Sequence, residues 1–292
     1  MIVLVGASGF FGSYILREIL NNTNETVIAT YSSNSDFVFN SNRVDWVRYN
    51  VLDPPDCLFD RLRAEEADVV YLAAYHNPDK VMENEALAWD INVTSLARFV
   101  NRCSGVKSFY YSSTDSVYGE GGEKVPLKEE AALHPVNRYG ELKLLAERIV
   151  LAKGFNILRF PFMFGPSLVR HKKHFFDKIL ESLRKGEKVE MFEDSIRSSI
   201  SFSEAARLSV SLLSKFHGKH HKVLNISSDD AISKYQFALK LAKNFHLDGR
   251  LVCPVSQADH PEIFKANRSL ITILDNSELK RTLNLSNIPM GL

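Results

Sequence analysis

The feature that most constrains the fold of this chain is a set of three glycines that follows its first apolar segment. Gly6, Gly9 and Gly12 have the spacing GxxGxxG, directly after the apolar run Ile2–Val5 and at the start of a helical pattern over Phe10–Asn21. A strand, a glycine-rich turn and a helix in this order form the phosphate-binding element of dinucleotide-binding folds. Gly6 would permit the tight turn, Gly9 the approach of backbone N–H groups to a pyrophosphate, and Gly12 close packing of helix on strand. The alternative is a glycine-rich turn that holds no ligand.

Short apolar runs alternate with helical patterns through the first half of the chain. We predict further strands over Thr26–Tyr31, Trp46–Tyr49, Asp68–Leu72, Lys107–Tyr111 and Asn156–Arg159, with helices near Lys80–Arg102 and Arg138–Ala152. Buried strands that alternate with crossover helices are typical of a parallel sheet with helices on both faces. The sequence therefore predicts an α/β fold with a Rossmann-like, doubly wound parallel sheet.

The pattern changes after Pro166, where the basic stretch 170–174 leads into a new helix. We predict a dinucleotide-binding domain over residues 1–166 and a smaller C-terminal α/β substrate lobe over residues 167–292, with some return of the chain to the core sheet. To this second lobe we assign helices near Phe175–Arg184, Ser203–Ser214 and Lys234–Asn244, and strands near Val223–Ile226 and Leu251–Cys253.

Charge and cysteine content exclude several classes of protein. Lys and Arg number 36 against 35 Asp and Glu, so no overall field favours nucleic acid or an anionic membrane as partner. The apolar runs are too short to span a membrane and the first residues lack a basic leader, so we expect a cytoplasmic protein. Cys57, Cys103 and Cys253 are too far apart for a zinc site, and we expect them to be reduced and buried. We predict no metal.

The end of the second predicted strand bears on the choice of cofactor. Enzymes that prefer NAD usually have an acidic residue here, which accepts a hydrogen bond from the ribose 2′-hydroxyl. This chain reads Ala29-Thr30-Tyr31-Ser32-Ser33 instead, so a 2′-phosphate would meet no repulsion, and Ser32, Ser33 and Arg43 could donate to it. We therefore expect NADP(H) to be preferred, with NAD(H) as a possible cofactor. The alternative is that these are ordinary loop hydroxyls.

Tyr139 and Lys143 lie four residues apart near the start of a predicted helix, so their side chains share one face. A neighbouring ammonium stabilises a phenolate and brings the pKa of the phenol toward the working range of an acid or base. Thr114 lies where a strand reaches the carboxyl edge of the sheet, and its hydroxyl can donate to an oxygen that gains charge. We predict these three as catalytic residues. For Ser112, Ser113 and Ser116, turn chemistry and capping are the alternative.

Five elements occur in an order that resembles the extended short-chain dehydrogenase/reductases acting on nucleotide sugars. They are Gly6–Gly12, Tyr71-Leu72-Ala73-Ala74, Asn92 in Asp90-Ile91-Asn92-Val93, Thr114 in Ser113–Gly119, and Tyr139 with Lys143. Within this superfamily the chain most resembles the dTDP-4-dehydrorhamnose reductase family. That likeness is carried by Ala73-Ala74-Tyr75 before Pro78-Asp79-Lys80, Ser113-Thr114-Asp115, Ile157-Leu158-Arg159 followed by Phe162 and Gly165, and Asn267-Arg268-Ser269 with Leu274-Asp275-Asn276-Ser277.

The resemblance implies NADPH-dependent reduction of a 4-keto, 6-deoxy nucleotide-diphosphate sugar by Thr114, Tyr139 and Lys143. It also implies a set of cofactor-binding residues: Gly6, Ser8, Gly9, Phe10, Phe11 and Gly12 at the pyrophosphate, Tyr31 and Ser32 at the ribose, Asn50 and Val51 at the adenine, and Leu72, Ala73, Ala74, Tyr75, Asn92, Ser112, Tyr139, Lys143 and Phe162 along the cleft. Asn92 would brace the site through hydrogen bonds. Asp115, Phe162, Arg197 and Arg268 would bind the substrate: Phe162 in place of a sugar-stacking tryptophan, and the arginines at phosphate, unless they are surface residues.

Departures from related families narrow the reaction. Dehydratases of the superfamily have a glutamate that takes a sugar proton where this chain has Ser116, and there is no cysteine near Thr114 for epimerisation of the deoxyfucose type. Three alternatives stay open: a 4-epimerase that holds NAD, a sugar dehydrogenase, and a catalytically silent NADP-binding regulatory subunit. A homodimer is open as well, because the helices near Lys80–Arg102 and Arg138–Ala152 form dimer interfaces in this superfamily but can equally cover the sheet.

Overall fold

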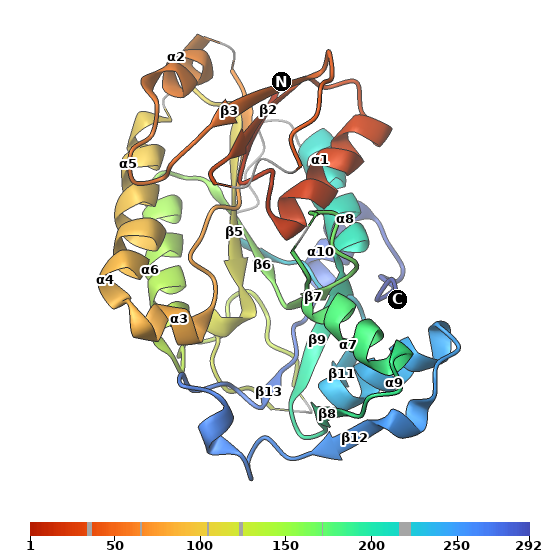
Figure 1. The fold of residues 1–292 in the computed structure, drawn as a ribbon. Helices are drawn as coiled ribbons and strands as arrows, with labels where there is room; N and C mark the ends of the chain where they lie inside the picture. Colours follow the sequence, from red (N-terminus) through yellow and green to blue (C-terminus); the bar gives the residue numbers. More distant parts are fainter. Residues whose placement is uncertain (34–36, 65, 104, 123–124, 171, 216–222) are drawn as a thin grey trace.

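The central element of the computed structural model is a seven-stranded sheet with the strand order β10-β6-β5-β4-β1-β2-β3 (Figure 1). The structure describes residues 1–33, 37–64, 66–103, 105–122, 125–170, 172–215 and 223–292. The strands are β1 (Ile2–Val5), β2 (Val27–Tyr31), β3 (Val44–Arg48), β4 (Asp68–Tyr71), β5 (Ser108–Thr114), β6 (Asn156–Phe160) and β10 (Val223–Asn225). All neighbours in this sheet pair in parallel, which confirms the predicted doubly wound α/β fold.

Two apolar cores lie on opposite faces of this sheet. Ile2 and Leu4 of β1 pack with helices α1 (Phe10–Asn22) and α8 (Phe202–Lys215), whereas Val3 and Val5 point to the other face. That face is covered by α2 (Asp56–Ala64), α5 (Ser95–Arg102) and α6 (Arg138–Ala152) (Figure 1). Because successive side chains of a strand point to opposite sides, a sheet buried on both faces needs uninterrupted apolar strands.

The helix predicted near Lys80–Arg102 is divided into four pieces. They are α3 (Pro78–Glu83), α4 (Glu85–Trp89), the π-helical turn η1 (Asp90–Thr94) and α5. Asn84 causes the first break, because its backbone is not helical and its side chain accepts a hydrogen bond from Leu87 N at 3.1 Å, which caps α4. The prediction of one continuous helix was wrong at this residue.

Two segments beyond residue 166 that we assigned to the second lobe lie with the large sheet. Helix α8 packs against α1, and β10 pairs with β6 at Val223 and Ile157. The amphipathic pattern predicted both elements, but it does not say which layer an apolar face will join. The short helix α10 (Ser277–Leu283) lies near them, and its Leu279 belongs to the same core.

The remaining C-terminal elements form a smaller unit with its own core around Phe164, Phe176, Phe237 and Leu241. Its helices are α7 (Phe175–Arg184) and α9 (Lys234–Asn244). Strand β8 (Val189–Phe192) pairs with β12 (Val252–Val255), and β9 (Ile196–Ser201) is flanked by β7 (Phe162–Phe164), β11 (Ala231–Ser233) and β13 (Ile271–Thr272). Three 3₁₀ turns complete the described elements: η2 (Asp115–Val117), η3 (Gly249–Leu251) and η4 (Pro261–Ile263).

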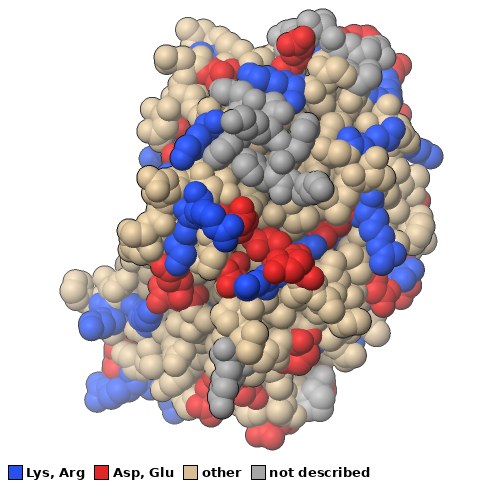
Figure 2. Space-filling view, turned by 180° about the vertical axis from the view of Figure 1, so that it is seen from behind, with Lys and Arg blue, Asp and Glu red and all other residues tan. Residues whose placement is uncertain are grey.

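The three cysteines are free, but they differ in burial. Cys103 is buried, whereas Cys57 is exposed on α2 and Cys253 is half-buried on β12, so the expectation of burial was wrong for those two. Residues of both charge signs are spread over the face shown in Figure 2, where an acidic group near the middle has basic side chains beside it. Within the described ranges, no helix combines the length and apolar character needed to cross a membrane.

Candidate active site

The glycine-rich turn connects β1 to α1 in a conformation that other residues would not tolerate. Gly6 has a φ of 92° and its backbone N–H donates to Thr30 Oγ1 at 2.8 Å. A Cβ on Gly6 would lie 3.3 Å from Ala73 N, and one on Gly12 only 2.1 Å from the carbonyl oxygen of Gly6. The helix can therefore approach the strand this closely only because position 12 lacks a side chain.

The start of α1 offers donors that fit a phosphate group. Gly9 is the N-cap and provides no side-chain acceptor, and the first turn contains no acidic residue. The first N–H groups of a helix have no partner within it, and the helix dipole makes this end electropositive. Ser8 and Phe11 are buried beside the turn. These residues fit the pyrophosphate of a dinucleotide.

The residues after β4 line the same edge of the sheet and are held in place by Asn92. Leu72 N donates to Val5 O at 2.9 Å, and Ala73, Ala74 and Tyr75 follow. The Asn92 side chain is buried in η1; its Oδ1 accepts from Tyr75 N at 2.8 Å, and its Nδ2 donates to Tyr75 O at 3.1 Å. Asn92 thus fixes both backbone polar groups of Tyr75, which is the kind of bracing that the resemblance implied.

The residues expected at the ribose and adenine lie at the ends of β2 and β3. Tyr31 ends β2 with its ring 6.3 Å from that of Trp46, and Ser32 after it is exposed. After β3, Asn50 Oδ1 accepts from Leu52 N at 3.1 Å, and Val51 is half-buried.

The side chain of Arg43 binds to the end of a helix and not at the place expected for a ribose phosphate. Its guanidinium donates to Thr23 O at 2.6 Å and to Leu20 O, both at the C-terminal end of α1. Cations are favoured at this end of a helix, because the last carbonyl groups lack partners and carry the negative end of the dipole. Arg43 is therefore a helix cap, and our inclusion of it among the donors to a 2′-phosphate was wrong.

Tyr139 is brought to the end of β5 by the start of α6. Asn137 caps this helix by accepting from Gly140 N at 3.0 Å, and a Cβ on Gly140 would lie 2.5 Å from Ser116 O. The helix start therefore packs directly on η2. Burial and the Asp115 carboxylate raise the pKa of Tyr139 above its ordinary value, while the nearby Thr114 hydroxyl lowers it. Tyr139 is consequently a neutral phenol near neutral pH.

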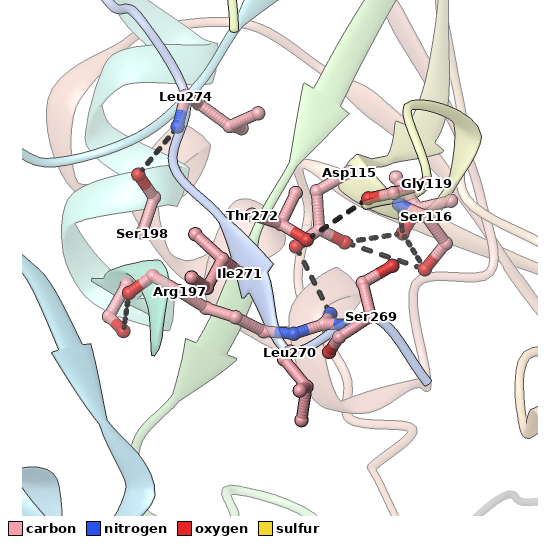
Figure 3. A network of polar contacts seen from close by, with 12 residues as sticks. Asp115, Ser116, Gly119, Arg197, Ser198, Ser269, Leu270, Ile271, Thr272 and Leu274 are labelled. Carbon is pink, nitrogen blue, oxygen red and sulfur yellow. Dashed lines mark hydrogen bonds and ion pairs between the residues drawn. The ribbon is translucent and has the colours of Figure 1, made fainter. Parts of the chain in front are cut away.

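Asp115 and Ser116, which follow Thr114, belong to a polar network that joins the large sheet to the smaller unit (Figure 3). Thr114 takes part in it. Its Oγ1 is 3.1 Å from Asp115 Oδ1 and 3.2 Å from Ser116 Oγ. Arg197 of β9 reaches across and donates from Nη1 to Asp115 Oδ2 at 3.2 Å, and from Nη2 to Ser269 O at 3.4 Å (Figure 3). Two of the expected substrate residues, Asp115 and Arg197, thus form an ion pair next to Thr114.

Lys143 is buried on α6, one turn beyond Tyr139. Its Nζ donates to the carbonyl oxygen of Ser112 at 2.5 Å and lies 4.0 Å from the centre of the Tyr111 ring. Burial lowers the pKa of Lys143 to about 7, against the opposing effect of Glu147. The proton on this ammonium is therefore weakly held in the free protein, where a lysine in water would keep it.

Replacement of Lys143 by Met should change how stability depends on pH. Between about pH 7.5 and 9.5 the unfolded chain carries a proton on Lys143 that the folded protein lacks, so this residue makes stability rise with pH. The contribution approaches one proton, about 1.4 kcal/mol per pH unit. We expect the slope of the unfolding free energy against pH, measured by urea denaturation, to be smaller by that amount in Lys143→Met. Equal slopes for the two proteins would contradict the shifted pKa.

The other two expected substrate residues already have close partners. Arg268 Nη2 donates to Asp79 Oδ2 at 2.8 Å and its Nη1 to Ala266 O at 2.9 Å, so it ties the C-terminal segment to α3. The ring of Phe162 has the Nζ of Lys234 only 2.7 Å from its centroid. That ring face is therefore occupied in the structure.

Lys234 and His76 lie at this site although the sequence analysis did not single them out. Lys234 faces Asp115 and Arg197, and His76, whose pKa is lowered mainly by burial, lies near Lys172 and Lys143. Lys234 directly follows a helix cap and His76 stands in a loop, so neither position has a local pattern that marks it. Within the described ranges, no cluster of three or more His, Cys, Asp or Glu could hold a metal ion, and the absence of a metal stays a prediction.

A buried ion pair connects the helix that carries Tyr139 and Lys143 with the strand that carries Thr114. Glu147, one turn after Lys143, accepts from Arg159 Nε at 2.9 Å and Nη2 at 2.7 Å. Glu147 also accepts from Ser113 Oγ at 2.5 Å, and Ser113 immediately precedes Thr114. Arg159 Nη1 donates further to the hydroxyl of Tyr118 at 2.8 Å. This network joins α6, β5 and β6 below the residues of the site.

A protein family and several known proteins are similar to this chain. A family model described as RmlD substrate binding domain matches residues 1–289. The methionine adenosyltransferase 2 subunit beta of Danio rerio is 29% identical over 167 residues, which cover 56% of this chain and 48% of that protein. This chain therefore aligns with about half the length of that relative.

Two solved structures share the fold over nearly the whole chain. A hypothetical dTDP-4-dehydrorhamnose reductase from Sulfolobus tokodaii has a TM-score of 0.78 at 26% identity, covering 98% of this chain and 96% of that one. The UDP-glucuronic acid 4-epimerase from Bacillus cereus, solved with UDP-glucuronic acid and NAD, has a TM-score of 0.83 at 19% identity, covering 98% and 93%. At that identity the second likeness concerns the fold alone.

Proposed function

Because the chain belongs to the RmlD substrate binding domain family, we propose that it is an NADPH-dependent reductase of a 4-keto, 6-deoxy nucleotide-diphosphate sugar. The observation that carries this proposal is the meeting of Thr114 and Tyr139 at the carboxyl end of β5, with Lys143 one helical turn away. Open α/β sheets bind their ligands at this edge, and the glycine turn lies at the same edge.

In the proposed reaction the chain's own residues manage the proton and the charge on the sugar oxygen. A bound nicotinamide supplies the reducing equivalent. Tyr139, held as a neutral phenol by its raised pKa, donates its Oη proton to the carbonyl oxygen. The Thr114 hydroxyl donates a hydrogen bond to that oxygen as it becomes negative. Lys143, one helical turn from Tyr139 on α6, offsets the charge of the resulting phenolate in its protonated form.

The neutral phenol of Tyr139 is the form that donates a proton in reduction, whereas a dehydrogenase or an epimerase would use the same group as a phenolate. Dehydration is disfavoured. Ser116 stands where a dehydratase needs a carboxylate, and its Oγ is 3.2 Å from Thr114 Oγ1.

A second candidate is a regulatory subunit without turnover of its own. The observation in its favour is the sequence similarity to methionine adenosyltransferase 2 subunit beta; against the Bos taurus protein of that name it extends over 96% of this chain at 24% identity. In this case the cofactor site would serve stability or assembly, and Thr114, Tyr139 and Lys143 would be retained without use. A 4-epimerase and a sugar dehydrogenase, which use the same residues, complete the alternatives.

The experiment that separates these candidates is an assay of NADPH oxidation with purified protein. The substrates are 4-keto, 6-deoxy sugars linked to dTDP, UDP or GDP. Stoichiometric consumption of NADPH with one of them would support the reductase. Interconversion of sugars without net consumption would favour the epimerase. Tight NADPH binding without turnover, together with co-elution with a methionine adenosyltransferase catalytic subunit, would favour the regulatory role.

We expect NADPH to bind more tightly than NADH, by roughly tenfold or more, because a 2′-phosphate meets hydroxyls and no carboxylate over Tyr31–Ser33. The measurement is a fluorescence titration of the purified protein with each cofactor. Ser32→Asp is the matched test, since a carboxylate at this position should repel the phosphate and accept from a free 2′-hydroxyl. Equal dissociation constants for the two cofactors in the unmodified protein would remove the proposed preference.

A further inference from the structure

Lys234 is a cation without an oxygen partner at the junction of the two units. It is the first residue of α9, is half-buried, and its Nζ lies 2.7 Å from the centroid of the Phe162 ring and 5.0 Å from that of Phe175. In the described part of the chain, no oxygen accepts a hydrogen bond from this Nζ. An ammonium at aromatic faces keeps some attraction but loses most of its hydration.

The charged side chains around Lys234 have an excess of positive charge. Arg197 of β9 repels the ammonium, and Asp115 of η2 attracts it. Asp115 is already engaged, because its Oδ2 is paired with Arg197 and its Oδ1 lies beside Thr114. His174, which precedes α7, also faces Lys234, but its pKa is lowered to about 4, so it is neutral near neutral pH. One carboxylate thus stands against two cations.

We propose that Lys234 binds an anionic group of the substrate, a carboxylate or a phosphate, next to the reacting carbon. The inference rests on the proposed function, because it takes Thr114 and Tyr139 as the markers of the reacting carbon. Lys234 follows Ser233 of β11, which pairs with Ile196 next to Arg197, and Arg197 donates to Asp115, the direct neighbour of Thr114. The ligand of Lys234 would therefore lie beside the sugar ring. The chemistry has two sources in a nucleotide sugar: the diphosphate, which every such substrate carries, or a carboxylate on the ring, which a 6-deoxy sugar lacks at C6.

Binding of an anion at Lys234 should take up a proton. Burial and Arg197 lower the pKa of Lys234 well below its ordinary value, so its ammonium loses the proton at a lower pH than a lysine in water does. An anion within hydrogen-bonding distance favours the charged form and raises this pKa. Proton uptake therefore distinguishes ion pairing at Lys234 from a merely structural role for its side chain.

The test is isothermal titration calorimetry at a series of pH values between neutral and alkaline, each in two buffers of different ionisation enthalpy. The ligands are UDP-glucuronate, UDP-glucose and dTDP-glucose, and the variants are Lys234→Met and Lys234→Arg. Lys240→Met is the matched control, because Lys240 lies on the same helix, is exposed, and has its Nζ 3.6 Å from Asp230. We expect Lys234→Met to weaken binding roughly tenfold or more and to abolish proton uptake, with affinity restored in Lys234→Arg.

The pattern of losses identifies the anion. An equal loss for all three ligands assigns Lys234 to the diphosphate, as the proposed 6-deoxy substrate requires. Weaker binding of UDP-glucuronate alone assigns it to a sugar carboxylate and replaces the 6-deoxy sugar of the proposed function by a sugar acid. Unchanged affinity and proton uptake in Lys234→Met, while the ligands still bind, would overturn this inference and leave the proposed function intact. Failure of these ligands, and of the 4-keto, 6-deoxy sugars linked to dTDP, UDP or GDP, to bind the unmodified protein and Lys240→Met would overturn the proposed function, and the inference with it.

Discussion

Replacement of Tyr139 by Phe should lower the rate of sugar reduction by roughly 10²-fold or more. The substitution removes only the hydroxyl, which is the proton donor in the proposed reaction. It leaves the aromatic ring at the start of α6. The dissociation constant for NADPH should stay within about twofold, because the phosphate-binding turn is untouched. Single-turnover kinetics with saturating NADPH measure the first quantity, and a fluorescence titration measures the second.

Tyr110→Phe is the matched control for this experiment. Tyr110 is a buried residue of β5, and its hydroxyl has no hydrogen-bond partner in the part of the chain that is described, so its loss should be nearly neutral for both stability and rate. A Tyr139→Phe protein that turns over at the rate of the Tyr110→Phe protein would refute the role of Tyr139 as proton donor. A parallel loss in both variants would instead indicate a general effect of altered packing.

The sheet could be predicted from the sequence because its strands are buried on both faces. Segments such as Ile2–Val5 and Asp68–Tyr71 must then be almost uninterrupted runs of apolar residues, and these are visible without any knowledge of pairing. The short strands of the smaller unit carry no such signal. Strand β9 reads Ile-Arg-Ser-Ser-Ile-Ser, and its three strand partners β7, β11 and β13 are two or three residues long. Their pairing depends on contacts between distant segments.

The sequence pattern also could not predict which layer of the fold a helix or strand joins. Helix α8 has an apolar face that fits either unit, and the structure places it against α1. The break at Asn84 shows a different limit, because asparagine is tolerated within helices as well as at their ends. An asparagine ends one helix and caps the next when its side chain can accept from a free backbone N–H, which here is that of Leu87.

In the candidate site, the reacting groups could be predicted from the sequence better than their hydrogen-bond and ion-pair partners. Tyr139 and Lys143 are marked by their spacing on one helix, and the turn geometry at Gly6 and Gly12 is marked by the glycines themselves. The partner of an arginine is set by the tertiary fold. Arg268 finds Asp79, which lies 189 residues earlier in the chain, and no local pattern could indicate this pair.

Replacement of Arg159 by Met should destabilise the protein by about 3–5 kcal/mol, since it leaves the Glu147 carboxylate buried without its cation. Both side chains are almost fully buried, and Glu147 would keep only the hydroxyl of Ser113 as donor. The measurement is urea denaturation monitored by circular dichroism. Arg250→Met is the control: Arg250 forms an exposed pair with Asp248, and because water screens such pairs, its loss should change stability little.

The double variant Arg159→Met with Glu147→Leu separates the cost of an unpaired charge from the loss of packing. Removal of the stranded carboxylate should recover part of the lost stability, because a buried ion pair can often be replaced by apolar side chains at little cost. The same variant should lower the pKa of Lys143 further, since Glu147 supports the charge on that ammonium. A double variant as unstable as Arg159→Met alone would show that the network acts through shape and not through charge.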